Sequence, residues 1–395
     1  MQQERILIRG LNWLGDAIMC LPALHRLREA RPEAHISILT SRKLADLWSP
    51  PLIDEVITFE KEERFWGVAR RLRPRRFTTG LILPTSIRSA LELWLAGIPV
   101  RVGVDYRGRA PLLTHPVASP ADALQIRKRT DREIRRLTAA SCQPEPLPAP
   151  LYSHHIYRYL SLVSVLGANP EPIAPHWPVS DQEVRDVLAR FALEPDAAGS
   201  PLFTMNPGCE YGPAKRWPED RFIESALALH RKTDCRWLLL GASGDVAACQ
   251  RIADVVGGRI GEAKVWNLAG KTSLRELGSL LKACSLLLGN DSGPMHLAAA
   301  VGTRVVTVFS STSAAITGPG LPEENKHLLL TSNAPCSPCF RRECPIDMRC
   351  MDSLGVDRVV QAAAGLYASS LELPPPCAHR TVHPANSTSA QAPGE

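Results

Sequence analysis

The sequence lacks long apolar runs. None of its uninterrupted hydrophobic stretches reaches the roughly 18–20 residues that a membrane-spanning helix needs. The first residues lead directly into the apolar segment Ile6–Ile8, without the hydrophobic core and cleavage site of a signal peptide. We therefore expect a cytoplasmic protein with no transmembrane segment. The 395 residues, 45% of them apolar, suffice for two globular domains or one large one.

Three common nucleotide-binding patterns are also missing. No Gly-x-Gly-x-x-Gly follows a predicted strand, which excludes the dinucleotide fingerprint. Gly270-Lys271-Thr272 resembles the end of a P-loop, but Val265 stands where that loop needs its first glycine. No Asp-x-Asp pair occurs, although transferases that hold a nucleotide-sugar diphosphate through a metal commonly use one. Cationic side chains and backbone N–H groups would therefore have to bind any phosphate.

The net charge of +6 is mildly basic, and the basic residues are clustered. One cluster spans Arg64–Arg76 and the other spans Gln125–Arg136. Such runs are commonly just solvated faces; the alternative is attraction to anionic lipid headgroups or phosphorylated substrates. Aromatic residues are not interleaved with the clusters and no nucleic-acid-binding motif is present, so nucleic acid is not an expected partner.

The cysteine count is 11, an odd number in a chain for which we expect a cytoplasmic location, so structural disulfides are not expected. Four thiols stand together as Cys336-x2-Cys339-x4-Cys344-x5-Cys350. Four thiolates at such spacings are able to close a tetrahedral zinc site. The two later gaps are irregular for a zinc knuckle, and the alternative is a reduced, metal-free loop.

Strand and helix patterns alternate along both halves of the chain, which predicts an α/β protein with parallel sheets covered by helices. Residues 1–168 form the predicted first domain, with a basic insertion at 116–150 and one long helix over Asp16–Ala30. A proline-rich linker at 169–178 precedes a second domain over 179–370. Residues 371–395, rich in Pro, Ala, Ser and Thr, are predicted to be a disordered tail.

Three polar turns follow predicted strands, at Gly10–Asp16, Asn206–Lys215 and Asn290–His296. Ligands in parallel α/β sheets bind beyond the carboxyl ends of the strands. The third turn enters a small-residue helix at Pro294, whose free N–H groups favour a phosphate. The alternative for this turn is a simple capped helix, with Asp291 or Ser292 as the cap.

Two further residues are candidates for chemistry. Lys215 places a cation before the next helix, where it is either a surface charge or the partner of a diphosphate held at Ser292–His296. Asp16 opens a helix, and as a plain N-cap it would contribute about 1 kcal/mol. In an interdomain cleft, an ionised Asp16 would instead accept a proton from an attacking hydroxyl.

Taken together and in this order, four segments resemble the ADP-heptose:lipopolysaccharide heptosyltransferases of glycosyltransferase family nine. They are Gly15-Asp16, Leu21–Leu24, Asn206–Pro218 and Asn290–His296. Within that family, the segment Glu210–Pro218 is most similar to heptosyltransferase II. The match runs from about residue 5 to about residue 365. The basic insertion and the C-terminal tail depart from compact members.

The resemblance implies a GT-B fold, in which two Rossmann-like domains face each other across a cleft. The first domain would bind the acceptor and the second would bind the donor, ADP-L-glycero-β-D-manno-heptose. It implies inverting transfer of L-glycero-D-manno-heptose, with no metal or other cofactor in catalysis. The acceptor would be the first heptose of heptosyl-Kdo2-lipid A. The enzyme would then work as a peripheral protein on the cytoplasmic face of the inner membrane.

The resemblance also implies residue roles. Asp16 would be the general base and Lys215 the diphosphate partner. The predicted contacts to the donor's sugar and phosphates are Asp291, Ser292, Gly293 and His296, with Asp245 at the ribose. By position alone, Ser86 and Arg88 are predicted acceptor contacts.

Three other functions compete with this interpretation. One is a family-nine transferase that acts on a different core acceptor. Another is a nucleotide-sugar epimerase on a similar scaffold, which would need acid and base groups on both faces of the sugar. The last is a non-catalytic lipid-surface binder that uses the basic clusters.

Overall fold

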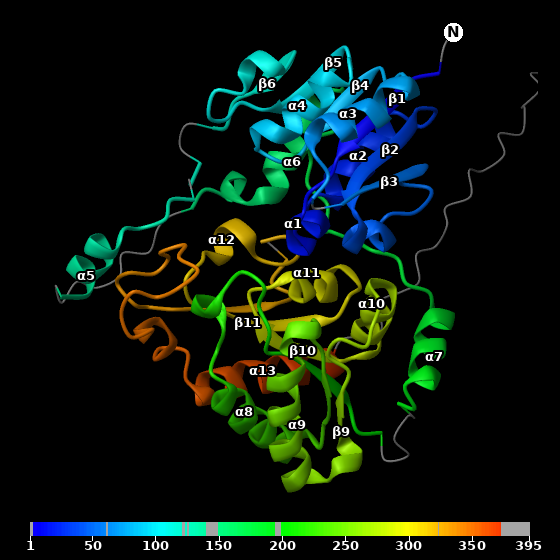
Figure 1. Ribbon diagram of the computed structural model, residues 1–395. Helices are drawn as coiled ribbons and strands as arrows, with labels where there is room; N and C mark the ends of the chain where they lie inside the picture. Colours follow the sequence, from blue (N-terminus) through cyan, green and yellow to red (C-terminus); the bar gives the residue numbers. More distant parts are fainter. Residues whose placement is uncertain are drawn as a thin grey trace, which may run out of the picture.

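The computed structural model describes residues 3–60, 62–120, 123–124, 126–139, 149–193, 199–322 and 324–372 (Figure 1). The predicted α/β architecture is confirmed, since two six-stranded parallel sheets are each covered by helices. Of the predicted tail, residues 373–395 lie outside the described part of the chain, and α13 extends through residues 371 and 372. No helix in the described part of the chain has the length and apolarity to cross a bilayer.

The first half is built on the sheet order β3-β2-β1-β4-β5-β6. Its central strands are almost wholly buried, as parallel strands covered on both faces require. The strands are β1 (Arg5–Arg9), β2 (His35–Ser41), β3 (Glu55–Phe59), β4 (Thr79–Ile82), β5 (Val100–Val104) and β6 (His115–Val117). The helices are α1 (Leu14–Met19), α2 (Leu21–Ala30), α3 (Phe65–Leu72), α4 (Ile87–Leu95) and α6 (His155–Ser164).

The second half is built on the order β12-β11-β10-β7-β8-β9. The strands are β7 (Leu202–Asn206), β8 (Arg236–Leu239), β9 (Val265–Asn267), β10 (Leu286–Asn290), β11 (Arg304–Phe309) and β12 (Leu328–Thr331). The helices are α7 (Asp181–Arg190), α8 (Glu219–Thr233), α9 (Val246–Ile260), α10 (Leu274–Ala283), α11 (Gly293–Ala300), α12 (Ala314–Thr317) and α13 (Val356–Glu372).

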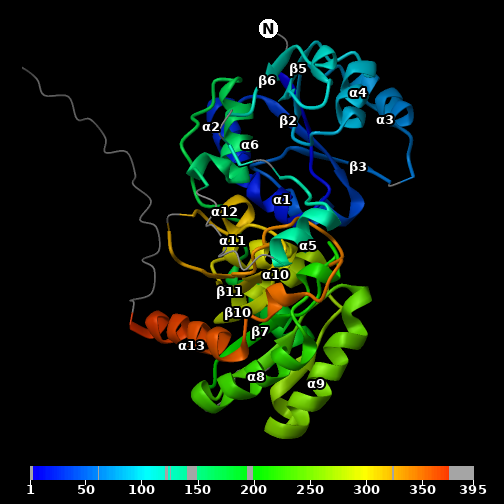
Figure 2. The same cartoon turned by 90° about the vertical axis from the view of Figure 1, so that its left-hand side faces the viewer.

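The two sheets repeat one topology. In each, the first strand in the chain pairs with the second on one side and with the fourth on the other. The strand order therefore reverses between β1 and β4 and again between β7 and β10, and such switch points are where ligands bind in open α/β sheets. Figures 1 and 2 show the halves stacked with α1 and α11 at the seam between them.

The helix predicted over Asp16–Ala30 is two helices. The first, α1, ends at Met19, and α2 begins at Leu21 with Pro22 in its first turn. Proline is compatible with a first helical turn and disfavours a helix interior, so the break falls at Cys20. The break gives α1 its own direction, and Figure 1 shows α1 on the seam, facing the second half.

The insertion predicted at 116–150 contributes to both halves. It begins inside β6, which pairs with β5 in the first sheet. Its predicted basic helix is α5 (Asp131–Ala139), and Ile134 of that helix is buried in the apolar core of the second half. Residues 140–148 lie outside the described part of the chain. The helix therefore packs away from the domain to which sequence reasoning assigned it.

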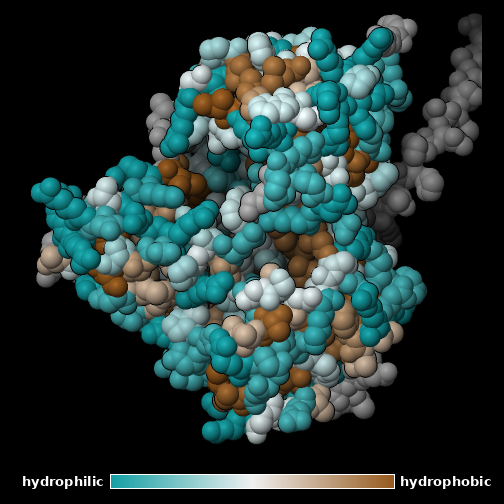
Figure 3. Space-filling view, in the orientation of Figure 1, coloured by the Kyte–Doolittle hydropathy of each residue, from teal (hydrophilic) through white to brown (hydrophobic). Residues whose placement is uncertain are grey.

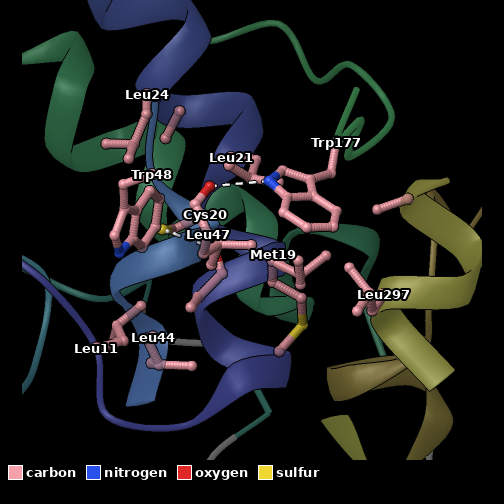
Figure 4. Packing of buried hydrophobic residues seen from close by; sticks show 14 of the residues in the cluster. Leu11, Met19, Cys20, Leu21, Leu24, Leu44, Leu47, Trp48, Trp177 and Leu297 are labelled. Atoms are coloured by element: carbon pink, nitrogen blue, oxygen red, sulfur yellow. Dashed lines mark hydrogen bonds between the residues drawn. The ribbon is translucent and has the colours of Figure 1, made fainter. Parts of the chain in front are cut away.

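The predicted linker carries a residue that joins both halves. The indole Nε1 of Trp177 donates to the carbonyl of Leu47 in the first half at 2.8 Å (Figure 4). Its backbone N–H donates to the carbonyl of Ala300 in the second half at 3.0 Å. Figure 4 shows Met19 of α1 and Leu297 of α11 in the same apolar cluster. One continuous core thus fixes the two switch points relative to each other.

Candidate active site at the seam of the two halves

The two switch points meet through helices α1 and α11, which lie in contact at two glycines. A Cβ atom at Gly15 would lie 2.6 Å from Cδ2 of His296. A Cβ atom at Gly293 would lie 2.9 Å from Cβ of Leu14. Each helix therefore places a side chain over a glycine of the other. This contact brings the predicted base Asp16 and the predicted donor-site residues of α11 to one place.

Asp16 is held by a histidine that the sequence analysis did not identify. Oδ1 of Asp16 lies 3.4 Å from Nδ1 of His155, at the start of α6. Burial works to raise the pKa of Asp16, but the hydrogen bond from His155 and the positive charge of Arg158 outweigh it. The net pKa is below the ordinary value. Asp16 is therefore ionised at neutral pH, as a general base must be.

The two histidines around Asp16 are neutral at pH 7. Burial lowers the pKa of His155, and it lowers the pKa of His296 to about 4. A neutral His155 with its proton on Nδ1 donates to the Asp16 carboxylate and fixes its orientation. His296 is buried on α11, and the charges of Asp291 and Asp16 both act to raise its pKa against the larger effect of burial.

The predicted diphosphate partner Lys215 is paired with a predicted donor contact. Its Nζ lies 2.5 Å from Oδ2 of Asp291, and the hydroxyl of Thr312 donates to the same oxygen at 2.5 Å. The ring of Tyr211 lies 4.6 Å from the ammonium. Only 11% of the Lys215 side chain and 5% of the Asp291 side chain are exposed. The carboxylate therefore holds the ammonium in a fixed, largely desolvated position.

The start of α11 keeps its anion-binding capacity. Ser292 stands at the N-cap position, but its side chain makes no capping hydrogen bond. Its hydroxyl donates instead to Oδ1 of Asn206 at 3.0 Å. The alternative in which the Ser292 side chain caps α11 is therefore wrong. N–H groups without a side-chain cap at a helix start are suited to a phosphate.

Two asparagines at the ends of β7 and β10 shape this region. Nδ2 of Asn290 donates to the carbonyl of Pro207 at 2.7 Å, and its Oδ1 accepts from the backbone N–H of Trp217 at 3.0 Å. Nδ2 of Asn206 donates to the carbonyl of Leu240 at 2.9 Å. Both side chains are buried; Asn290 ties the Lys215 loop to the end of β10, and Asn206 joins the end of β7 to the residue after β8.

Asp245, predicted at the ribose, contacts the same loop. Its Oδ2 accepts from the backbone N–H of Ala242 at 3.1 Å, and Oδ1 lies 3.5 Å from Arg216. A Cβ atom at Gly208 would lie 2.2 Å from that carboxylate, so only glycine fits there. The structure therefore shows Asp245 supporting the loop that carries Lys215.

Ser86 and Arg88, the predicted acceptor contacts, open α4 beside the first switch point. The hydroxyl of Ser86 caps α4 by accepting from the backbone N–H of Ser89 at 3.2 Å. Nε of Arg88 donates to Glu92 at 2.9 Å. Glu92 is fully buried and also accepts from Arg9 at 2.7 Å. Sequence reasoning missed this ion pair because Glu92 lies in a helix pattern that is compatible with a solvated residue.

A buried arginine holds the Ser86 turn in place. Arg109 is wholly buried, and burial lowers its pKa to about 10. Its Nε donates to the carbonyl of Val104 at 2.7 Å and its Nη1 donates to that of Pro84 at 2.5 Å. The end of β5 is thereby linked to the turn before α4. This link fixes the position from which Ser86 and Arg88 project.

The four predicted metal ligands line one small cavity of about 10 Å³, together with Ile134 of α5. They are Cys336, Cys339, Cys344 and Cys350. Burial raises the pKa of Cys336 and Cys339, and it raises that of Cys350 to about 12. Within the described part of the chain, no group of three or more His, Cys, Asp or Glu side chains is arranged to hold a metal ion. The thiols share a cavity, but they do not form a ready ligand set.

Residues 334–350, the cysteine segment, lie against the loop that carries Lys215. The backbone N–H of Ala214 donates to the carbonyl of Arg342 at 3.0 Å, and the Tyr211 hydroxyl donates to that of Phe340 at 2.8 Å. On its other side, the segment contacts α5 and the residues just before that helix. The backbone N–H of Arg129 donates to the carbonyl of Cys339 at 3.0 Å, and Arg135 donates to that of Pro345 at 2.8 Å. The segment therefore links the insertion to the loop that carries Lys215.

Comparison with known proteins identifies the family of the chain. The profile described as glycosyltransferase family 9 (heptosyltransferase) matches residues 130–349, more than half of the chain. The chain belongs to glycosyltransferase family 9. It is therefore a glycosyltransferase, and the predicted resemblance and fold are confirmed.

Along most of its length, the chain is similar to proteins named heptosyltransferase 2 or II. It is 30% identical over 364 residues to lipooligosaccharide heptosyltransferase 2 of Campylobacter jejuni, an alignment covering 90% of this chain and 97% of that protein. It is 29% identical over 339 residues to lipopolysaccharide heptosyltransferase 2 of Escherichia coli, covering 80% and 85%. The solved structure of E. coli ADP-heptose LPS heptosyltransferase II superposes with a TM-score of 0.70 at 25% identity, covering 93% and 99%.

Proposed function

We propose that the protein transfers L-glycero-D-manno-heptose from ADP-L-glycero-β-D-manno-heptose to the first heptose of heptosyl-Kdo2-lipid A. The names of its relatives, heptosyltransferase 2 and ADP-heptose LPS heptosyltransferase II, support this substrate pair. The observation that carries the proposal is the contact of α1 with α11. It brings a carboxylate of the first half beside a cationic, phosphate-suited helix start of the second half.

On the acceptor side, the proposed step is proton removal by Asp16. Its carboxylate is ionised and oriented by His155, at 3.4 Å. It would take the proton of the acceptor hydroxyl as that oxygen attacks the anomeric carbon of the donor. The Asp16 side chain is 26% exposed and that of His155 12%, and this partial removal from water strengthens the effect of one fixed charge.

On the donor side, the proposed role of the second half is to hold the diphosphate as the leaving group gains charge. An ammonium carries three N–H donors, and among the described residues only Asp291 accepts one from Lys215. The remaining donors and the uncapped start of α11 would hold the departing ADP. In this proposal Asp291 acts mainly by fixing Lys215, while Ser292, Gly293 and His296 contact the donor and Asp245 lies by the ribose.

The proposed transfer inverts the anomeric centre and needs no metal. A single displacement requires one base and no covalent intermediate, and Asp16 supplies that base. Positive charge for the diphosphate comes from Lys215 and backbone N–H groups. The product linkage seen by NMR would test the inversion. Full activity after exhaustive chelation would test independence from metal, and loss of activity restored by one divalent ion would contradict it.

The proposed acceptor is a lipid, so the enzyme would work as a peripheral protein on the cytoplasmic face of the inner membrane. Ser86 and Arg88, at the start of α4, would contact the acceptor's sugar. Their position beside the end of β4, next to β1 and Asp16, supports this assignment.

The decisive experiment is incubation with ADP-heptose and heptosyl-Kdo2-lipid A, comparing the parent protein with Asp16→Asn. The amide keeps the shape of the side chain and removes its basicity, so we expect a loss of at least about a hundredfold in kcat. Asp46→Asn, outside the site, is the matched control and should retain parent activity. No product from the parent would overturn the acceptor or donor assignment, and full activity in Asp16→Asn would overturn the base.

A second acceptor is the competing proposal within the family, since the same machinery would serve any heptose hydroxyl. Assaying Kdo2-lipid A and more fully decorated cores alongside the proposed acceptor distinguishes these cases. An epimerase would convert ADP-heptose without any acceptor, so mass-neutral conversion of the donor alone would favour that alternative.

A further inference from the structure

Helix α4 has an unusual distribution of residues between its two faces. Its inward face buries Glu92, paired with Arg9 and Arg88. Its outward face presents Ile87, Trp94 and Leu95, which are 53%, 48% and 37% exposed. A solvent-facing helix surface is normally polar, so this apolar outward stripe requires another explanation.

The neighbouring helix α3 extends this apolar stripe with an aromatic residue and cations. Trp66 is 52% exposed, and the guanidinium of Arg64 lies 5.0 Å from its ring centre. Arg70 follows Trp66 one turn further on the same face of α3, and Arg73 comes directly after the last residue of that helix. We call the outward residues of α3 and α4, together with the adjoining Arg73, the α3–α4 surface: Trp66, Arg70, Arg73, Ile87, Trp94 and Leu95. Figure 3 shows a brown patch on this face of the first half, in the region of α4.

The charge of the α3–α4 surface is positive. The acids on or beside it are Glu62 and Glu63, and Glu63 is paired with Arg71 at 2.9 Å. Among the described residues, Arg70 and Arg73 form no ion pair. An open cavity of about 460 Å³ lies between the C-terminal ends of the two helices, with Arg73 and Arg76 in its wall. Exposed tryptophans, aliphatic side chains and unpaired arginines together match an anionic lipid–water interface.

The surface also has a fixed relation to the active site. Helix α4 begins at the carboxyl end of β4, the strand next to β1 and its following turn with Asp16. The stripe from Ile87 to Trp94 therefore starts at the edge of the site and runs roughly 10 Å away from it. A bilayer bound there would present the headgroups of its lipids to the acceptor side.

We propose that the α3–α4 surface binds the surface of an anionic lipid bilayer. The assignment deepens the proposed function, because it names the surface by which an enzyme with a lipid acceptor would reach its substrate. The binding itself depends on neither ADP-heptose nor lipopolysaccharide, so it is testable without them.

The test uses the full chain and sedimentation with vesicles of phosphatidylcholine, with or without phosphatidylglycerol. We expect the parent to bind the anionic vesicles and to be released by salt. Trp66→Ser/Trp94→Ser should reduce partitioning at least about tenfold, since both side chains would lose their interfacial contacts. Val255→Ser, at a 46% exposed position on α9, is the apolar control and should bind like the parent.

Charge-reversal variants provide an independent test of vesicle binding. Arg70→Glu/Arg73→Glu should abolish the preference for anionic vesicles, while Arg231→Glu/Lys232→Glu on α8 makes the same charge change on the other half and should preserve it. Melting temperatures confirm that each variant is folded. Equal loss in the matched controls, or no vesicle binding by the parent, would overturn the proposal. So would a parent dimer that the tryptophan variant converts to monomer.

Activity measurements separate this proposal from the proposed function. With an acceptor stripped of its acyl chains, Trp66→Ser/Trp94→Ser should turn over like the parent, whereas with acceptor in vesicles its KM should rise. Vesicle binding without any heptose transfer would support membrane binding by the α3–α4 surface and overturn the proposed reaction. Equal activity of the variant on both acceptors would overturn the role of this surface in substrate delivery.

Discussion

Gly15→Ala tests whether the contact of α1 with α11 organises the active site. The added Cβ atom would lie 2.6 Å from Cδ2 and 3.0 Å from Nε2 of His296. Ordinary contact begins at 3.4 Å, so the two helices must separate locally by about 0.8 Å, or the buried imidazole must leave its position. Asp16 is the next residue along α1, and it shifts with either adjustment.

The expected magnitudes differ for stability and activity. Overpacking a buried contact costs about 1–3 kcal/mol. The gain from replacing a helical glycine by alanine, about 0.5–1 kcal/mol, offsets part of that. The expected net loss in the free energy of unfolding is therefore about 0–2.5 kcal/mol, centred near 1 kcal/mol. A displacement near 1 Å at a reacting group can cost about a hundredfold, so we expect a fall of that order in kcat/KM for heptose transfer.

Two further variants isolate the cause. Gly258→Ala makes the same chemical change on α9, where the added Cβ atom would meet no other atom within 4 Å. This variant should be slightly more stable than the parent and equally active. Gly15→Ala/His296→Ala removes the clashing ring and should recover stability without recovering activity. The reasoning is refuted if Gly15→Ala alone keeps kcat/KM within about twofold of the parent with an unchanged melting temperature.

Three other predictions follow from buried groups. Burial lowers the pKa of His154 and His296 to about 4, so stability present above pH 6.5 should be lost as the pH falls toward 4. The free energy of unfolding should fall by at most about 1.4 kcal/mol per pH unit for each histidine. Melting curves recorded across this pH range measure the fall, and a melting temperature that does not change with pH would contradict the prediction. Ile134→Ala should weaken docking of α5 by about 2–4 kcal/mol, seen as faster hydrogen exchange in α5, whereas exposed Arg132→Ala should not. Protein purified without added zinc should contain near one equivalent of metal if the cysteine segment binds it, and less than about a tenth would end that hypothesis.

The predicted site residues that the structure brings together all came from local patterns. A buried strand followed by a polar turn and a helix is readable over about ten residues. Parallel topology then places such turns at one edge of a sheet, without any knowledge of distant contacts. Asp16, Lys215 and His296 were found in this way. Their order along the chain, rather than any one turn, gave the resemblance to the family its specificity.

The residues that were missed depend on contacts far apart in the chain. Asp16 and His155 are separated by 139 positions, and Arg9 and Glu92 by 83. His155 stands at the start of a helix whose pattern gives no sign of its partner, and the same is true of Glu92. The docking of Ile134 on the second half was equally unpredictable, because a basic helix with one aliphatic position is typical of a solvated surface.

The pairing of Lys215 with Asp291 shows why residue type alone gives an incomplete account of a site. Sequence reasoning directed both charges at the donor, the cation to its diphosphate and the carboxylate, with its neighbours, to its sugar and phosphates. The structure joins them at 2.5 Å, with both side chains largely buried. A desolvated ammonium without a counter-charge would be costly, and Asp291 supplies that charge while leaving N–H donors free for an anion. In the proposed function the carboxylate therefore acts on the phosphate through Lys215, a role that depends on the pairing and that neither residue reveals by itself.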